Sequence, residues 1–212
     1  MRAVLFDLDG TLCDTIEDLT ASINYALRTF DYPPRTVDEM RTFVGNGIRL
    51  QVLRALPKDA PEMHVPAVES LFRAHYAAHC VGKTRPYPGI LNLLTELKRR
   101  GYRLGVITNK PQISAARLID ALFPKGTFAL VMGQEPGGLL KPDPALLRAA
   151  LDAVGADEAV YVGDSDVDVQ FAHGAGLPCY GCAWGFRGRA HLAAAGADRI
   201  ADTVDELLTF FD

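Results

Sequence analysis

Short apolar runs alternate with amphipathic segments along most of this chain. Four runs are bounded by polar residues or turn signals, as buried strands are. They span residues 3–6, 102–108, 128–133 and 159–164. Apolar residues at helical spacing follow in the segments 111–123, 143–155 and 167–176. Strands that alternate with helices predict an α/β fold, in which a parallel sheet with right-handed crossovers carries helices on both faces.

The C-terminal part of the chain continues this pattern. Two more short strands are predicted in "LPCYGCAWG" (177–185) and "ADRIAD" (197–202), and a final helix is predicted in "VDELLTFF" (204–211). Pro111 suits the first position of a helix, and Gly155 suits the end of one. The predicted sheet therefore extends to the end of the sequence.

Residues 15–84 interrupt the alternation, because they contain helical patterns and no strand pattern. Residues 15–30 place apolar side chains on one helical stripe, and Thr36 with Glu39 forms a possible capping box. Pro66 could break or restart a helix in the segment 61–80. We therefore predict a sheet core formed by residues 1–14 and 85–212, with a helical insert at 15–84 and a return linker within 81–89.

Polar residues gather where the predicted strands end. In open parallel sheets, sites form beyond the carboxyl ends of the strands. The residues at these ends are Asp7, Asp9, Thr108, Asn109, Lys141, Asp164, Asp166 and Asp168. Taken singly, Thr108 could cap a helix and Lys141 could be a solvated lysine. A calcium loop starting at Asp164 is disfavoured, because the sixth position is Val169 and not glycine.

Together these side chains predict a site that binds an anionic group and carries out a reaction on it. Acids from two strands can bind a hard cation such as Mg²⁺ through oxygen, and the cation offsets their mutual repulsion. A lysine charge and a threonine hydroxyl can hold a phosphate group. One carboxylate can then act as a nucleophile while its neighbour acts as an acid and base.

The four strand-end stretches are similar to the four motifs of the haloacid dehalogenase superfamily. These stretches are "DLDGTLCDT" (7–15), "VITNK" (106–110), "LLKPDP" (139–144) and "VGDSDVD" (162–168). The resemblance implies a Rossmann-like sheet core, and the insert at 15–84 resembles the C1-type α-helical cap of that superfamily. Within it, "VGNG" (44–47), "PYPG" (86–89), 177–186 and 196–208 are most similar to the phosphoglycolate phosphatases.

The resemblance implies a role for each motif residue. Asp7 would attack phosphorus and become an aspartyl phosphate. Asp9 would protonate the leaving group and then activate water. Thr108 and Lys141 would hold the transferring phosphoryl group. The implied Mg²⁺ ligands are Asp7, Asp9 and Asp164, with Asp168 beside them.

Substrate contacts are expected from Asn109 and from the predicted cap. The cap candidates are Asn46, Gly47 and Arg49, whose ordinary alternative is a turn followed by a solvated arginine. The expected reaction is Mg²⁺-dependent hydrolysis of a small phosphate monoester, with 2-phosphoglycolate as the first candidate. A phosphomutase, or a phosphatase for pyrophosphate, nucleotides or sugar phosphates, is the alternative. A receiver-type phosphorylation switch is a more remote alternative.

Charge and composition limit the classes of partner that this chain is expected to bind. The net charge of −4 and the pI near 5.7 provide no basic surface for nucleic acid or an anionic membrane. No apolar run approaches the roughly 18 residues of a membrane span, and no signal peptide pattern is present, so a cytoplasmic monomer or homodimer is expected. Cys179 and Cys182 lack a second pair for zinc, and all four cysteines are expected to be ordinary buried thiols.

Overall fold

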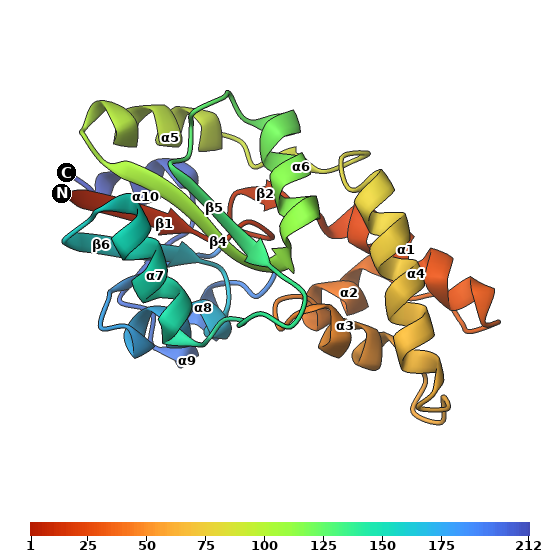
Figure 1. Cartoon of the computed structure of the whole chain (residues 1–212). Coiled ribbons are helices and arrows are strands. Elements are labelled where there is room, and N and C mark those ends of the chain that lie inside the picture. Colours follow the sequence, from red (N-terminus) through yellow and green to blue (C-terminus); the bar gives the residue numbers. More distant parts are fainter.

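A six-stranded parallel sheet forms the centre of the larger part of the molecule in this computed structural model, which describes residues 1–212 (Figure 1). The strand order is β5-β4-β1-β6-β7-β8. The strands are β1 (Arg2–Phe6), β4 (Arg103–Pro111), β5 (Leu130–Gln134), β6 (Glu158–Gly163), β7 (Cys179–Cys182) and β8 (Arg199–Ala201). The predicted α/β fold with a parallel sheet is confirmed. Central β1 pairs with β4 on one side and β6 on the other, which brings three strand ends together.

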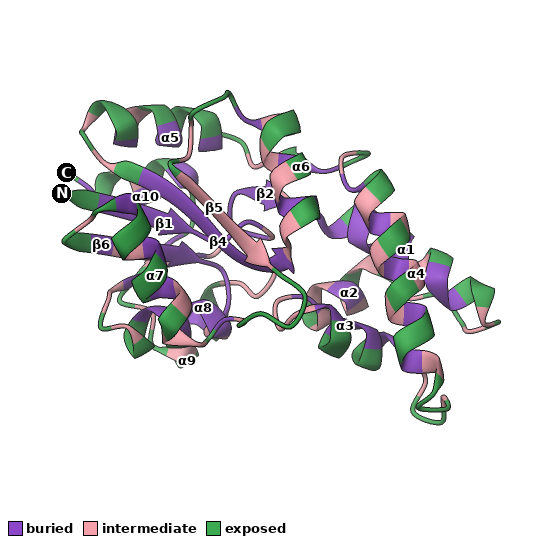
Figure 2. Cartoon of the chain, viewed as in Figure 1, coloured by how far each residue is buried: buried purple, intermediate pink, exposed green.

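Helices cover both faces of the sheet, because consecutive residues of a strand point to opposite faces. Val4 and Phe6 of β1 pack on the face covered by α5 (Ile90–Arg99), α6 (Gln112–Leu122) and α10 (Val204–Thr209). Leu5 packs on the opposite face, against α7 (Pro144–Val154), α8 (Asp166–Gly174) and α9 (Arg189–Ala195). Figure 2 shows that the strands between these two layers are largely buried. Helices α5 and α9 were not predicted from the sequence.

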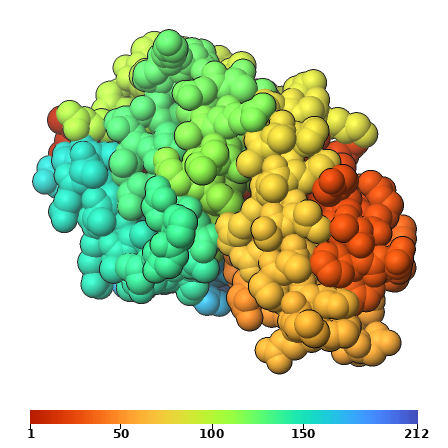
Figure 3. Space-filling view, turned by 45° about the vertical axis from the view of Figure 1, so that its right-hand side comes forward, coloured from red at the N-terminus to blue at the C-terminus, as the bar shows by residue number.

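Residues 15–84 form a second, helical part of the molecule. Its helices are α1 (Ile16–Thr29), α2 (Val37–Phe43), α3 (Ile48–Ala55) and α4 (His64–His79), and no strand lies between residues 15 and 84. The predicted capping box is confirmed at the start of α2, where Thr36 Oγ1 accepts from Glu39 N at 3.2 Å. Pro66 lies in the first turn of α4, where proline is tolerated, and does not break it. Figure 3 shows this part as a lobe beside the sheet.

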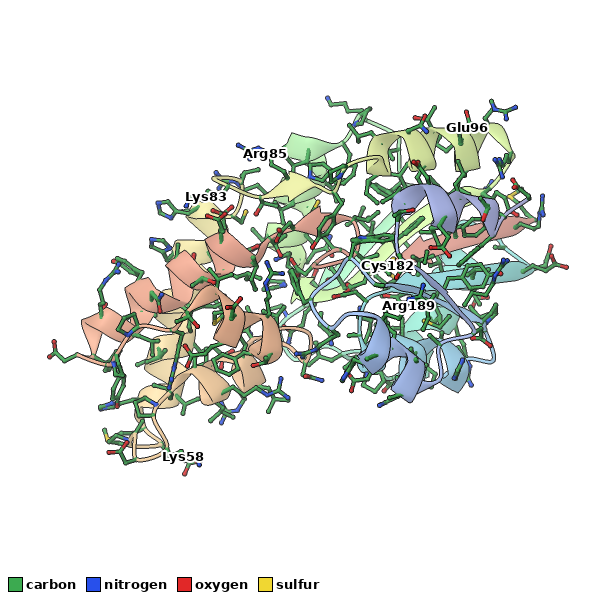
Figure 4. All side chains as sticks on the ribbon, turned by 180° about the vertical axis from the view of Figure 1, so that it is seen from behind. Lys58, Lys83, Arg85, Glu96, Cys182 and Arg189 are labelled. Carbon is green, nitrogen blue, oxygen red and sulfur yellow. The ribbon has the colours of Figure 1, made fainter.

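Two chain segments connect the helical part to the sheet, and they form a small antiparallel ribbon. It consists of β2 (Cys13–Asp14) and β3 (Arg85–Pro86). The Asp18 carboxylate adds a further tie by accepting hydrogen bonds from the backbone N–H groups of Lys83 and Thr84. Figure 4 shows Lys83 and Arg85 along this return connection. Two-residue strands are too short to have a readable sequence period, which is why this ribbon was not predicted.

Two expectations from composition can be compared with the structure. All four cysteines are free and buried, as predicted; Cys182 lies at the end of β7 within the sheet part (Figure 4). None of the helices combines the length and the apolar character needed to cross a membrane.

Candidate active site

Three neighbouring strands deliver the predicted polar residues to one edge of the sheet. Asp7 follows β1 directly, Thr108 lies near the end of β4, and Asp164 follows β6. Asp168, in the first turn of α8, lies beside Asp7 and Asp164. Carboxylate oxygens of Asp7, Asp164 and Asp168 all lie within 4.8 Å of one another. The structure therefore brings the acids of the first and fourth motifs into one buried cluster.

Lys141 is the cation of this cluster. Its Nζ lies 2.9 Å from Asp7 Oδ1, 2.8 Å from Asp168 Oδ1 and 3.0 Å from the hydroxyl of Tyr161. Lys141 is buried, which works against its charge, but Asp168 and Asp7 raise its pKa well above the usual value. The side chain is therefore a permanently protonated lysine held in a fixed position. No sequence pattern marked Tyr161, which donates its own hydrogen bond to the carbonyl of Ile107.

Asp168 organises its neighbours with both of its oxygens. Oδ1 accepts a hydrogen bond from Lys141 Nζ. Oδ2 accepts from Asp164 N, Ser165 N and Ser165 Oγ at 3.1, 3.0 and 2.6 Å. The last three bonds form the N-terminal cap of α8. A Cβ on Gly163 would lie only 2.3 Å from the Asp168 carboxyl carbon, so this approach requires glycine. Asp168 therefore fixes Lys141 and the backbone that carries Asp164.

Asp164 is held in place from the other side of the cluster. Its Oδ2 accepts from Phe186 N at 2.7 Å, and its Oδ1 accepts from Thr11 Oγ1 at 3.3 Å. Cβ atoms on Gly10 and Gly185 would both approach the Asp164 side chain to 2.3 Å. Two glycines therefore make room for this one carboxylate at the edge of the sheet.

The acids outnumber the cation in this cluster. Burial, and then the charges of Asp168 and Asp9, raise the pKa of Asp7 from 3.8 to about 6, although Lys141 opposes the shift. Burial, Asp168 and Asp7 also raise the pKa of Asp164 well above its usual value. Three buried carboxylates and one lysine leave an excess of negative charge when all are ionised. The donor set is therefore suited to a hard divalent cation, which prefers carboxylate oxygen.

Asp9 lies next to this cluster and has a cation of its own. Its Oδ1 accepts from Thr15 Oγ1 at 2.5 Å and lies 2.9 Å from Lys110 Nζ. Lys110 is buried and also donates to the hydroxyl of Tyr76 at 2.6 Å. Tyr76 belongs to α4, so this chain of contacts joins the sheet to the helical part. Sequence analysis did not select Lys110 or Tyr76, since neither side chain differs locally from an ordinary lysine or core tyrosine.

Thr108 and Asn109 follow each other on β4 but do different things. Thr108 Oγ1 accepts from Lys110 N at 3.3 Å, which leaves its hydroxyl proton free to donate. Asn109 Nδ2 donates to the carbonyls of Gly45 and Lys141, and its Oδ1 accepts from Lys141 N at 2.7 Å. The Asn109 amide is thus occupied by protein partners. In this structure it positions the Lys141 loop and the turn at Gly45, and its expected contact with substrate stays a prediction.

A small cavity of about 30 Å³ lies between the acids and the helical part, with room for one or two water molecules. The sheet side of its wall contains Asp7, Asp9, Thr108, Asn109, Lys110 and Pro111. The helical side contains Leu19, Val44, Gly45, Gly47, Ile48, Gln51, Phe72 and Tyr76. Gly47 therefore lies at the cavity, and its expected contact with substrate stays a prediction.

The other two expected cap residues lie elsewhere. Asn46 and Arg49 line an adjoining, wider cleft of about 580 Å³ between the helical part and the loop after β5, which shares Gly47, Ile48 and Pro111 with the cavity. Arg49 is exposed, and Asn46 Oδ1 accepts from Arg54 at 2.9 Å. Gln51, two residues after Arg49, faces the cavity, and the expected substrate contacts of Asn46 and Arg49 stay predictions. The signal was present: Ile48, Gln51, Val52 and Ala55 are buried at helical spacing, and Gln51 is the polar exception.

Comparison with known proteins is consistent with this geometry. A family model described as haloacid dehalogenase-like hydrolase matches residues 4–182, which include all four motifs. The chain belongs to this family. Among haloacid dehalogenase-like hydrolases, phosphoglycolate phosphatase 1 of Pseudomonas aeruginosa is 35% identical, over 100% of this chain and 80% of that protein. The phosphoglycolate phosphatase of Rhodospirillum rubrum is 39% identical, over 95% of this chain and 87% of that protein.

Solved structures extend the similarity to the whole fold of this haloacid dehalogenase-like hydrolase. A predicted phosphoglycolate phosphatase from Haemophilus somnus has a TM-score of 0.91 at 29% identity, covering 99% of this chain and 97% of that one. CbbY from Rhodobacter sphaeroides, in complex with phosphate, has a TM-score of 0.80 at 29% identity, covering 97% and 95%. The expected superfamily and enzyme class, a hydrolase similar to phosphoglycolate phosphatases, are confirmed.

Proposed function

We propose that this protein is a Mg²⁺-dependent phosphatase that hydrolyses a small phosphate monoester, with 2-phosphoglycolate as the first candidate, through an aspartyl phosphate. Relatives named phosphoglycolate phosphatase over most of the chain support the substrate class. A similar structure in complex with phosphate supports phosphate binding. The single observation that carries the proposal is the buried cluster of three carboxylates around one lysine.

Asp7 and Asp164 are the residues proposed to hold Mg²⁺, together with the backbone carbonyl of Asp9. The excess of negative charge in the cluster fits a divalent cation. When bound, Mg²⁺ would neutralise charge on the carboxylates and on the phosphoryl oxygens. Asp168 was also expected near the metal; because both of its oxygens are engaged by protein donors, we assign it to positioning Lys141 and the Asp164 backbone.

Asp7 is proposed as the nucleophile. One of its carboxylate oxygens attacks phosphorus, the bond from phosphorus to the ester oxygen breaks, and Asp9 gives a proton to the leaving alkoxide. Asp9 then takes a proton from the water that attacks the aspartyl phosphate, which releases phosphate and restores Asp7. Thr15 and Lys110 both contact Asp9 Oδ1, so Oδ2 is left for these proton transfers.

Lys141 and Thr108 are proposed to stabilise the transferring phosphoryl group. Lys141 contributes a fixed positive charge 2.9 Å from the Asp7 carboxylate. The Thr108 hydroxyl accepts from the Lys110 backbone and so keeps its proton for a phosphoryl oxygen. Both groups are buried and held by protein contacts before substrate arrives, which is the arrangement that stabilises developing charge best.

Residues 15–84 are proposed to act as a cap that closes over this site, with residues 1–14 and 85–212 as the catalytic core. The cavity between the two parts has room for only one or two water molecules. A phosphate ester therefore enters only when the helical part and the sheet part separate. The ribbon of β2 and β3 joins the two parts and is the natural place for that movement. Closure excludes water from the aspartyl phosphate until hydrolysis.

A phosphate-release assay tests the proposal. The protein should release phosphate from 2-phosphoglycolate over many turnovers with Mg²⁺, and chelation should stop turnover until Mg²⁺ is restored. Acid-quenched single-turnover samples should carry one phosphoryl group on the peptide that contains Asp7. A phosphomutase would transfer the group to a second hydroxyl with little release, and a receiver-type switch would release one phosphate per chain. Full activity after exhaustive chelation would contradict the metal role.

A further inference from the structure

Gln51 is a buried amide that the proposed chemistry does not use. It lies on α3, is 4% exposed, and lines the cavity that also contains Asp7, Asp9 and Thr108. Its side-chain nitrogen is fully buried and has no hydrogen-bond partner. A buried donor without a partner is costly, and nearly all such donors in folded proteins are paired. The position of Gln51 therefore indicates a partner that arrives from outside the chain.

Most other side chains on the helical side of the cavity cannot supply this hydrogen bond. Leu19, Val44, Ile48 and Phe72 are apolar. The hydroxyl of Tyr76 accepts from the Lys110 ammonium at 2.6 Å and keeps its own proton as a donor. Gln51 is therefore the only side chain on the helical side of this cavity with a buried polar atom that has no hydrogen-bond partner at all.

Lys110 provides the matching group on the sheet side. Its ammonium has three donors, of which one goes to Tyr76 and one faces Asp9 Oδ1 at 2.9 Å. One donor remains, on a side chain that lines the same cavity. A neutral amide and a lysine charge on opposite walls suit a small anionic acceptor, because hydrogen bonds to a charged acceptor are the strong ones.

We infer that Gln51 is the specificity residue for the leaving group, and that its amide donates a hydrogen bond to the carboxylate of the substrate opposite Lys110. This inference rests on the proposed function, since it places the phosphoryl group at Asp7 and the rest of the ester toward α3. The substrate class is a short phosphate ester whose leaving group carries a carboxylate. Arg49 lines the adjoining cleft and not this cavity, so this contact is assigned to Gln51.

The test compares Gln51→Met with the wild type on two esters. Methionine keeps the length and burial of the side chain and removes its donors. We expect kcat/KM for 2-phosphoglycolate to fall about ten- to hundredfold. Hydrolysis of p-nitrophenyl phosphate, whose leaving group lacks a carboxylate, should change less than about twofold. Glycolate should inhibit p-nitrophenyl phosphate hydrolysis more weakly in the variant, by a similar factor.

Thermal unfolding supplies a readout that separates this role from a structural one. Removing an unpaired buried donor should raise the Tm of Gln51→Met by a few degrees, whereas loss of a structural side chain would lower it. Gln51→Leu provides a second apolar variant with the same expectation. Leu53→Gln is the matched control: Leu53 is 43% exposed on the same helix, and adding an amide there should leave both esters unaffected.

Each outcome decides the inference. Equal losses on both esters with a lower Tm would assign Gln51 to structure, and no loss on either ester would remove it from the site. If the wild type hydrolyses p-nitrophenyl phosphate but neither hydrolyses 2-phosphoglycolate nor responds to glycolate, the carboxylate assignment is wrong while the phosphatase proposal stands. If the wild type releases phosphate from no ester with Mg²⁺, the proposed function itself fails.

Discussion

Replacing Asp164 with asparagine should stabilise the metal-free protein and remove its stabilisation by Mg²⁺. The pKa of Asp164 is raised by burial and by the neighbouring acids, so the folded state holds its proton more tightly than the unfolded chain does. Such an acid does not lower the free energy of unfolding at low pH, where it is protonated in both states. It lowers the free energy of unfolding increasingly as the pH rises from its unfolded to its folded pKa. At pH 7 the wild type therefore bears this cost, and asparagine removes it.

The size of both effects follows from the cluster. Carboxylate oxygens within 4.8 Å repel by at least about 3.5 kcal/mol per ionised pair at an effective dielectric of about 20. Protonation and Lys141 relieve part of this, so we expect a net gain of about 1–2 kcal/mol, or about 2–8 °C in Tm. Mg²⁺ at a hundred times its Kd stabilises the wild type by about 2.7 kcal/mol, or about 5–11 °C. This second shift should disappear in the variant.

Thermal unfolding with chelator and with excess MgCl₂ measures both shifts on the same sample. Asn can keep the present contacts, because its oxygen can accept from Phe186 N while Thr11 turns its hydroxyl to accept. Asp166→Asn is the matched control: Asp166 lies two residues away, is only partly buried, and contacts His191 at 3.0 Å. Its Mg²⁺ response should equal that of the wild type. A destabilised metal-free Asp164→Asn protein, or one that still responds to Mg²⁺, would refute the reasoning.

Four further predictions concern the same site. Asp7→Asn should keep the fold and abolish phosphate release, because an amide is a poor nucleophile; activity within about tenfold of wild type, about 1.4 kcal/mol in the barrier, would contradict this. Since the pKa of Asp7 rises from 3.8 to about 6, this group should lower the metal-free stability by about 2 kcal/mol between pH 4 and pH 6, as measured by denaturant unfolding. The same shift predicts that activity at limiting Mg²⁺ falls below pH 6 and that added Mg²⁺ moves this fall to lower pH; a profile independent of Mg²⁺ would argue against metal binding at Asp7. Lys110→Met should lower Tm by about 6–12 °C, since breaking a buried ion pair costs about 3 kcal/mol. The same variant should also reduce kcat, because Asp9 loses the ammonium that it contacts. An unchanged kcat would show that Lys110 does not position Asp9.

Strand ends were the part of the site that the sequence could predict. The run from Ala3 to Phe6 is apolar because β1 is buried on both faces, and Asp7 interrupts it where the chain leaves the sheet. Parallel strands place such positions on one edge, so the acids of the first and fourth motifs had to meet. The helical insert was predictable as well, because the 3.6-residue period of α1 is a local property of the chain.

Roles that depend on direction around a helix were decided by tertiary structure. Arg49 and Gln51 are two residues apart on α3, which separates their side chains by about 200° around the helix axis. The sequence favoured Arg49 for its charge, but packing of Ile48 and Val52 into the core turns Gln51 toward the cavity and leaves Arg49 exposed. Only the docking of α3 against α2 and α4 fixes that rotation.

Hydrogen-bond partners from distant segments were also beyond the sequence. Asn109 was a reasonable substrate ligand by its place after Thr108, yet its amide is used by Gly45 and by the Lys141 backbone, which are far away in the chain. Lys110 has no local feature that marks it, and it gains its position from Asp9 in the loop after β1 and from Tyr76 on α4. Local periodicity records which residues are buried, while the partners of a buried polar group are chosen by long-range packing, which one stretch of sequence does not contain.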